Sequence, residues 1–225
     1  MLRRTRFDER FLAVPCYQLV APFQSSDLRR LAVVHSGGAI FAYTKVDADD
    51  LEAVSKLEVL GFRRICTQVR MRFRFEVPPT AAADARIDNH LELSPTDIRD
   101  HAAQLETGRI RQDPLIATET AFEFYMAWIR NSTSGGKRVA SIDHNFLTFA
   151  DTAGIRTIDL LSVLNKRSGI AKRLLATITE GARKEGLREV RVVTDCGNIA
   201  AGHAYNATGF VPERFLAVLH LHSGH

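Results

Sequence analysis

The sequence predicts a mixed α/β fold with a second, smaller α/β domain at its N-terminal end. Short runs that alternate in polarity or are rich in β-branched residues, and so suit strands, are interleaved with runs at helical spacing. A strand-like run closes the chain after the last helix, which favours an α+β mixed sheet. A break at residues 78–90, rich in Pro, Ala and Asp, is typical of a linker and predicts domains over 1–85 and 86–225.

Composition limits the possible classes of protein. Of the 225 residues, 45% are apolar, which is ample for a core, and the net charge of +4 favours anionic partners. No nucleic-acid motif is present and basic residues do not alternate with aromatics, so small phosphate-bearing ligands are favoured over DNA or RNA. Cys16, Cys66 and Cys196 are widely spaced, which predicts neither disulfides nor a metal site. Because no signal peptide or membrane span is predicted, we expect a cytoplasmic protein.

In the N-terminal domain, residues 47–61 predict a helix and residues 69–77 predict a strand. The helix has acidic residues at its start, apolar residues near helical spacing and a glycine at its end. The strand alternates apolar residues with charged ones, so Arg70, Arg72 and Arg74 share one face. We favour a solvated face, whose charges keep the sheet soluble or pair with acidic neighbours, over a ladder that binds an anion.

In the C-terminal domain we expect a short strand, two helices, three strands, a helix, a strand, a short helix and a closing strand. Their expected ranges are 91–93, 94–106, 120–131, 138–142, 145–150, 156–163, 168–185, 189–195, a helix from 198 onward, and 215–222. The apolar closing strand could complete the sheet or pair with a second copy of the chain, so a monomer and a homodimer both stay open. No internal repeat is visible.

The helix expected over 168–185 begins in a way that suggests an anion site. Its apolar stripe, which would pack on the sheet, consists of Ala171, Leu174, Leu175, Ile178 and Ala182. Gly169 has no side chain to cover the N–H groups of the first turn, at the positive end of the helix dipole. Four cations surround that point: Lys166, Arg167, Lys172 and Arg173. One glycine alone would suit an ordinary Ser-capped helix, whereas the added charge favours a pyrophosphate site.

Two motifs resemble the GCN5-related N-acetyltransferase (GNAT) superfamily. The first is KRSGIA at 166–171, which resembles the family's pyrophosphate loop with Lys166 in place of the usual Gln or Arg. The second is NIAAGHAYNATGF at 198–210, a helix that carries a tyrosine and ends in Gly-Phe. Three further segments, FDERFLAVPCYQL, KLEVLGF and FYMAWIRN, resemble a narrower group, TDP-fucosamine acetyltransferase and its relatives. That group acetylates the 4-amino group of a nucleotide-linked deoxysugar, although RRICTQ after LGF lacks the carboxylate expected there.

The resemblance implies the GNAT fold, with acetyl-CoA as the cofactor and a defined set of cofactor-binding residues. Two neighbouring strands would splay apart, and backbone groups of Leu161, Ser162 and Val163 would pair with the pantetheine amides. The pyrophosphate would be held by Arg167, Ser168, Gly169, Ile170, Ala171 and Lys172. Asn198 would cap the last helix and touch the cofactor.

Tyr205 is the expected catalytic acid. It lies seven residues after Asn198, two helical turns onward and on the same face. A phenol with a pKa of about 10 keeps its proton at neutral pH and can give it to a departing thiolate. The alternative is a core tyrosine packed on the sheet. No base is assigned, because each candidate side chain also suits a structural role and a water relay stays open; the candidates are Glu123, Asp143, His144 and Asp159.

These observations predict an N-acetyltransferase that moves an acetyl group from acetyl-CoA to the amino group of a nucleotide-linked amino-deoxysugar, for surface polysaccharide synthesis. The N-terminal domain would cover the side of the acceptor substrate. One alternative is the same chemistry on another amine, such as a protein N-terminus, a polyamine or an antibiotic. A second is a non-catalytic module that binds acyl-CoA.

Overall fold

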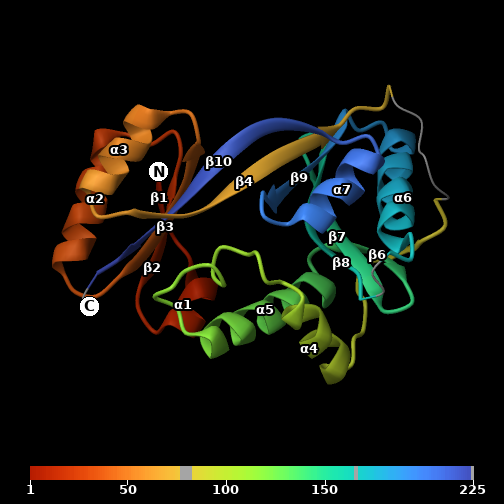
Figure 1. The fold of residues 1–225 in the computed structure, drawn as a ribbon, viewed down its shortest axis with the longest axis horizontal. Helices are drawn as coiled ribbons and strands as arrows, with labels where there is room; N and C mark the ends of the chain where they lie inside the picture. Colours follow the sequence, from red (N-terminus) through yellow and green to blue (C-terminus); the bar gives the residue numbers. More distant parts are fainter. Residues whose placement is uncertain (77–82, 165–166, 224–225) are drawn as a thin grey trace. The chain divides into compact units, whose positions relative to one another are not determined.

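The computed structural model describes residues 1–76, 83–164 and 167–223, and it has a mixed α/β fold (Figure 1). Within these residues the helices are α1 (Arg6–Leu12), α2 (Ser25–Ser36), α3 (Leu51–Val59), α4 (Pro95–Ala103), α5 (Thr118–Thr133), α6 (Ile170–Lys184) and α7 (Ile199–Ala207). The strands are β1 (Leu2–Arg4), β2 (Cys16–Val20), β3 (Phe41–Asp47), β4 (Arg63–Phe73), β5 (Arg86–Asp88), β6 (Arg138–Ile142), β7 (Asn145–Thr152), β8 (Ile155–Ser162), β9 (Glu189–Asp195) and β10 (Val211–His222).

The chain forms two compact units that interleave along the sequence. The first comprises Met1–Gln68, Thr107–Phe124 and Phe215–His225, and the second comprises Val69–Glu106 and Tyr125–Arg214. The strand order is β1-β2-β3-β10-β4 in the first unit and β10-β4-β9-β8-β7-β6-β5 in the second. Strands β4 and β10 therefore contribute residues to both units.

In the first unit, β2 and β3 pair in parallel with α2 between them in the chain, and β3 pairs antiparallel with β10. Helix α3 begins after Asp50, whose carboxylate accepts the N–H of Ala53 at 3.0 Å, so the acidic helix start acts as an N-cap. The core of this unit joins the strands to α2 and α3; its buried members are Leu19, Leu31, Ile40, Ala42, Val46, Val54, Leu57, Phe62, Ala217, Leu219 and Leu221.

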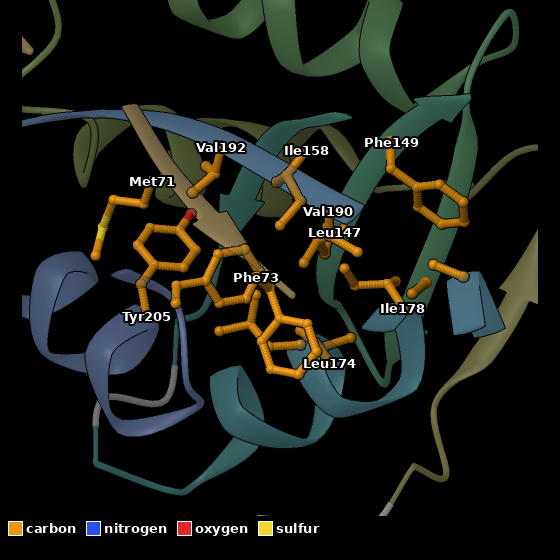
Figure 2. Packing of buried hydrophobic residues seen from close by; sticks show 14 of the residues in the cluster. Met71, Phe73, Leu147, Phe149, Ile158, Leu174, Ile178, Val190, Val192 and Tyr205 are labelled. Atoms are coloured by element: carbon orange, nitrogen blue, oxygen red, sulfur yellow. The ribbon is translucent and has the colours of Figure 1, made fainter. Parts of the chain in front are cut away.

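In the second unit, β5 to β8 pair antiparallel in sequence, and β8 pairs in parallel with β9 across the connection made by α6. The stripe predicted for α6 is buried, because Leu174, Leu175, Ile178 and Ala182 have 0% exposure. These side chains belong to a core cluster with residues of β4, β7, β8, β9 and α7, part of which Figure 2 shows. This packing fixes the start of α6 relative to the ends of β8 and β9.

The two units share a local arrangement. The series β3-α3-β4 and β9-α7-β10 match element for element, with equivalent residues 148 positions apart, as Asp50 and Asn198 are. Each helix has nine residues and an N-cap whose side chain accepts a backbone N–H, and each ends in Gly-Phe. The two glycines have nearly equal φ values, 90° at Gly61 and 93° at Gly209. The sequence shows no repeat here because backbone geometry recurs where most side chains differ.

Most of the other predicted elements are present, with three differences. Residues 91–93 are not a strand; the short strand is β5, inside the expected linker, and it pairs with β6 through Arg86 and Ser141. Strand β4 runs from Arg63 to Phe73, so it both starts and ends earlier than expected. Residues 74–76 are not a strand, and residue 77 lies outside the described residues. Helices α1 and α2 were not predicted. On the arginine face of β4, Arg72 lies 3.8 Å from Glu213, which agrees with the favoured pairing with acidic neighbours.

Among the described residues, no helix combines the length and the apolar character needed to cross a membrane. Among the described residues Cys16, Cys66 and Cys196 form no disulfide, and of the three Cys196 is exposed.

Candidate active site

Strands β8 and β9 stop pairing before they end. The last paired residues are Ile158 and Val192, although β8 continues to Ser162 and β9 to Asp195. On its other side β8 contains a bulge, because the register against β7 skips Asp159. A bulge bends its strand, and this one lies where pairing with β9 stops. Beyond it, the backbone groups of the two strands do not pair with each other, which is the arrangement that the resemblance implied.

In the segment between β8 and α6, two of the described residues are left-handed. Asn145 on β7 anchors the loop, because its Oδ1 accepts the N–H of Leu164 at 2.8 Å. Arg167 has a φ of 63°, and Gly169, the N-cap of α6, has a φ of 79°. Gly169 itself has no side chain to cap the first turn. A Cβ added at Gly169 would meet no heavy atom within 4 Å, so the space beside this residue is open.

The positive charge around this loop is smaller than the sequence suggested. Arg167 and Lys172 are exposed, as expected, whereas Lys166 lies outside the described residues. Arg173 is not a free cation, because its guanidinium pairs with Asp84 at 2.6 Å. Sequence alone could not reveal this pair, whose partners are 89 residues apart.

The other residues expected to hold the pyrophosphate can do so through their backbone. Ser168 is exposed, and its hydroxyl accepts the N–H of Ile170 at 3.4 Å. The side chain of Ile170 is 7% exposed and belongs to the core, so only its main chain can face a ligand. Ala171 is half-buried. The first turn therefore offers N–H groups rather than side chains, as an anion site at a helix start requires.

Two of the residues expected beside the pantetheine, Leu161 and Val163, are half-buried at the margin of the core cluster. The third, Ser162, uses its side chain elsewhere, because its Oγ lies 2.7 Å from Nδ1 of His101. The Nε2 atom of His101 lies 3.0 Å from the backbone carbonyl oxygen of His144. A carbonyl only accepts, so Nε2 carries the proton and the Ser162 hydroxyl donates to Nδ1. Ser162 can therefore offer a cofactor its backbone and the acceptor lone pairs of its hydroxyl, but not the hydroxyl proton.

His101 is the site residue that sequence reasoning missed. It lies on α4 with 0% exposure, and its ring meets Phe146 edge-on at 4.8 Å between centroids. Burial lowers the pKa of His101, so the ring is neutral at neutral pH. The bond to Ser162 spans 61 residues of sequence, and no local pattern marks it.

Tyr205 lies on α7 with 3% of its surface exposed. Its ring packs against Phe210 with centroids 5.4 Å apart. Figure 2 shows its hydroxyl end pointing toward Val192, the last residue of β9 that pairs with β8. Within the described part of the chain this hydroxyl makes no hydrogen bond. Burial raises the pKa of Tyr205 above the ordinary phenol value, so the group stays protonated at neutral pH.

Asn198 is the N-cap of α7, and its Oδ1 accepts the N–H of Ala201 at 3.1 Å. The predicted capping role is confirmed. Its side-chain oxygen is committed to the helix, so a cofactor could meet only its remaining polar atoms.

The candidate bases have structural explanations. Asp159 accepts from the Ser132 hydroxyl at 2.9 Å and pairs closely with Lys137. The other three were expected to suit a turn, a loop and an exposed helix position, and they are found so: Asp143 has a φ of 53°, the side chain of His144 is 67% exposed, and Glu123 is exposed on α5. His144 Nδ1 also lies 3.3 Å from Asp97 Oδ2, and no base is assigned among the four.

Comparison with known proteins identifies the fold. No family model matches the sequence, and no curated protein matches it. Solved structures do match. A GCN5-related N-acetyltransferase from Sphaerobacter thermophilus superposes with a TM-score of 0.59 at 16% identity, covering 98% of this chain and 76% of that one. A GCN5-related N-acetyltransferase from Kribbella flavida gives 0.52 at 14% identity, covering 96% and 83%. A tandem GNAT protein from the clavulanic acid biosynthesis pathway gives 0.54 at 15% identity, covering 94% and 76%. The chain therefore has the mixed α/β fold of GNAT acetyltransferases.

Proposed function

We propose that this chain is an acetyl-CoA-dependent N-acetyltransferase of the GNAT superfamily. The observation that carries the proposal is that one unit contains both the ends of β8 and β9 that do not pair with each other and Tyr205, whose hydroxyl has no hydrogen-bond partner among the described residues. That hydroxyl is therefore available to a ligand. The structural similarity to GNAT acetyltransferases, at 14–16% identity, supports the fold alone. The proposed activity is argued from the residues of this chain.

The residues present fit coenzyme A. Open space beside Gly169 and the N–H groups at the start of α6 would accept a diphosphate, with Arg167 and Lys172 as exposed cations. Leu161 and Ser162 pair with β7 but not with β9, so backbone groups of Leu161, Ser162 and Val163 on the β9 side would hold the pantetheine arm. When bound, acetyl-CoA supplies the activated acetyl group as a thioester.

The chain's own contribution to proton transfer would come from Tyr205. Its phenol, protonated because burial raises its pKa, would deliver a proton from the hydroxyl oxygen to the departing sulfur. The hydroxyl then needs no other partner, in agreement with its surroundings. No side chain is assigned as the base, and a water would relay the proton of the amine.

For the acceptor, we propose the amino group of a nucleotide-linked amino-deoxysugar, as in surface polysaccharide synthesis and as TDP-fucosamine acetyltransferase uses. The net charge of +4 supports an anionic acceptor over a cationic polyamine. Residues 1–85 would lie on the acceptor side. Another amine, such as a protein N-terminus or an antibiotic, is the second candidate.

A thiol-release assay with a panel of acceptors tests this proposal. The full chain is incubated with acetyl-CoA and, separately, with amino sugar nucleotides, polyamines, peptides and aminoglycosides. We expect saturable thiol release with an amino sugar nucleotide above the hydrolysis background. Thiol release with a different amine, and with no amino sugar nucleotide, would show that the proposed acceptor is wrong and that the acetyl transfer itself is right. Calorimetric binding of CoA without release on any amine would instead support a non-catalytic acyl-CoA module.

A further inference from the structure

The first unit contains a cavity of about 250 Å³ that the proposed acetyl transfer does not use. It is lined by residues from the start of β4, from the loop between α4 and α5, and from the end of β10. Three of these residues, Asp113, His220 and His222, place potential metal-ligand atoms within 4.8 Å of one another. All three belong to the first unit.

The geometry of this cluster is convergent. His220 and His222 are two residues apart on β10, so their side chains leave the same face of the strand. His220 Nδ1 lies 2.6 Å from Asp113 Oδ2, and His222 Nε2 lies 2.7 Å from the same oxygen. Asp113 is 2% exposed and His220 is 1% exposed. One carboxylate oxygen is thus flanked by two imidazole nitrogens in a largely buried position.

The surrounding residues hold the three side chains in place. The other carboxylate oxygen of Asp113 accepts the N–H of Leu115 at 3.0 Å. The ring of Phe41 packs edge-on against His220 and His222, with centroids 4.9 and 5.0 Å away. Such supporting contacts set the orientation of metal ligands in known sites.

Hydrogen bonding alone leaves this cluster unsatisfied. Nε2 of His220 is buried and has no hydrogen-bond partner in the described part of the chain. A network that served only as a structural clasp would be expected to pair both nitrogens of a fully buried imidazole. The second nitrogen of His220 lacks a partner, yet the first is fixed on Asp113 beside a second imidazole.

We propose that Asp113, His220 and His222 bind a divalent transition-metal ion. Two imidazoles and one carboxylate form a ligand set that suits Zn²⁺ and its neighbours, whereas Ca²⁺ and Mg²⁺ prefer oxygen ligands alone. Metal bonds of about 2.0–2.1 Å in a tetrahedron place ligand atoms about 3.3 Å apart, so each nitrogen would move outward by about 0.6 Å. Three protein ligands leave one position for water or an anion from the cavity.

This site would join distant parts of the sequence. Asp113 and His220 are separated by 107 residues, and the ion would cross-link the loop after α4 to the last strand. The sequence prediction of no metal site was based on the wide spacing of the cysteines. That spacing argues against a site with thiolate ligands and says nothing about one formed by Asp113, His220 and His222.

Zinc titration of the full-length, untagged, chelator-treated protein tests the proposal. Calorimetry should show one Zn²⁺ bound per chain, and His222→Ala should weaken that binding at least about tenfold. His35→Ala, which removes an exposed histidine on α2, should leave the affinity unchanged. Ca²⁺ in place of Zn²⁺ should give no heat. Zn²⁺ at 100 times its Kd should raise the folded-to-unfolded ratio about 100-fold in the unaltered chain.

Because loss of a buried imidazole could prevent folding, Asp113→Asn provides a second variant of nearly unchanged shape. It should fold, as judged by circular dichroism, and lose the thermal shift that Zn²⁺ gives to the unaltered protein. The proposal is overturned if the unaltered chain binds no Zn²⁺, or if His222→Ala and Asp113→Asn bind it with unaltered affinity.

Discussion

Replacing Tyr205 by phenylalanine should separate the stability of this protein from its activity. The variant keeps the ring, which packs on Phe210, and removes only the hydroxyl. That hydroxyl has no partner within the described residues and is not fully buried, so its removal breaks no hydrogen bond within the protein. We expect the free energy of unfolding of Tyr205→Phe to stay within about 0.5 kcal/mol of that of the unaltered protein, which keeps Tm within roughly 2 °C for a chain of this size.

The same variant should lose turnover. If the phenol delivers the proton to the departing thiolate, its removal should lower kcat by about 10²–10⁴-fold, the range found for general acids. The affinity for CoA should change little, because the expected cofactor contacts lie on β8 and α6. Thermal denaturation gives the first quantity, thiol release gives the second, and calorimetry with CoA gives the third.

A buried tyrosine in the first unit provides the matched control. Tyr43 is 9% exposed, with the guanidinium of Arg109 3.9 Å from the centre of its ring. Tyr43→Phe should leave kcat unchanged. Unchanged kcat in Tyr205→Phe would refute the acid role. A fall in the stability of Tyr205→Phe by 1 kcal/mol or more would show that the hydroxyl already has a partner in the protein.

Three further predictions follow from the second unit. Gly169→Ala should lower the free energy of unfolding by only about 1–2 kcal/mol, through backbone strain at a φ of 79°. It should also weaken CoA binding, as measured by calorimetry, because the added methyl group enters the open space beside the start of α6. His101, whose pKa burial lowers, should contribute a loss of stability as pH falls below the unfolded value of about 6.5, since the unfolded chain then binds the proton first. Melting curves from pH 7.5 to 5.5 should show a smaller loss in His101→Gln. Arg156→Met should lower stability by about 3 kcal/mol, because the fully buried guanidinium pairs with Asp151 at 2.8 Å and Glu185 at 2.7 Å; a Tm within 2 °C of the unaltered protein would contradict this.

Local signals in the sequence predicted the elements whose identity is local. The stripe of α6, the alternation in β4 and the cap of α7 each follow from residues a few positions apart, and each is present. Strand β5 could not be found in this way. Its three residues, Arg86–Asp88, are a strand because β6 pairs with them, and that pairing is set by tertiary structure.

The candidate site divides in the same manner. Motif and helix signals located Gly169 and Tyr205 in the sequence. The bulge at Asp159, which coincides with the end of pairing between β8 and β9, leaves no mark in composition. The contact of His101 with Ser162 also leaves no mark in the sequence, because it depends on where α4 packs. The repeat at 148 positions was missed because it preserves caps and turns, while Leu57 stands where the second copy has Tyr205.

The shared strands β4 and β10 have a practical consequence for anyone who dissects this protein. Each of them changes from one unit to the other partway along its length, so no single truncation or protease cut releases either half with all its strands. Fragments expressed alone would carry an unpaired sheet edge and tend to aggregate. Complementation, in which two separately produced pieces regain solubility only when mixed, is the behaviour to expect from such a chain.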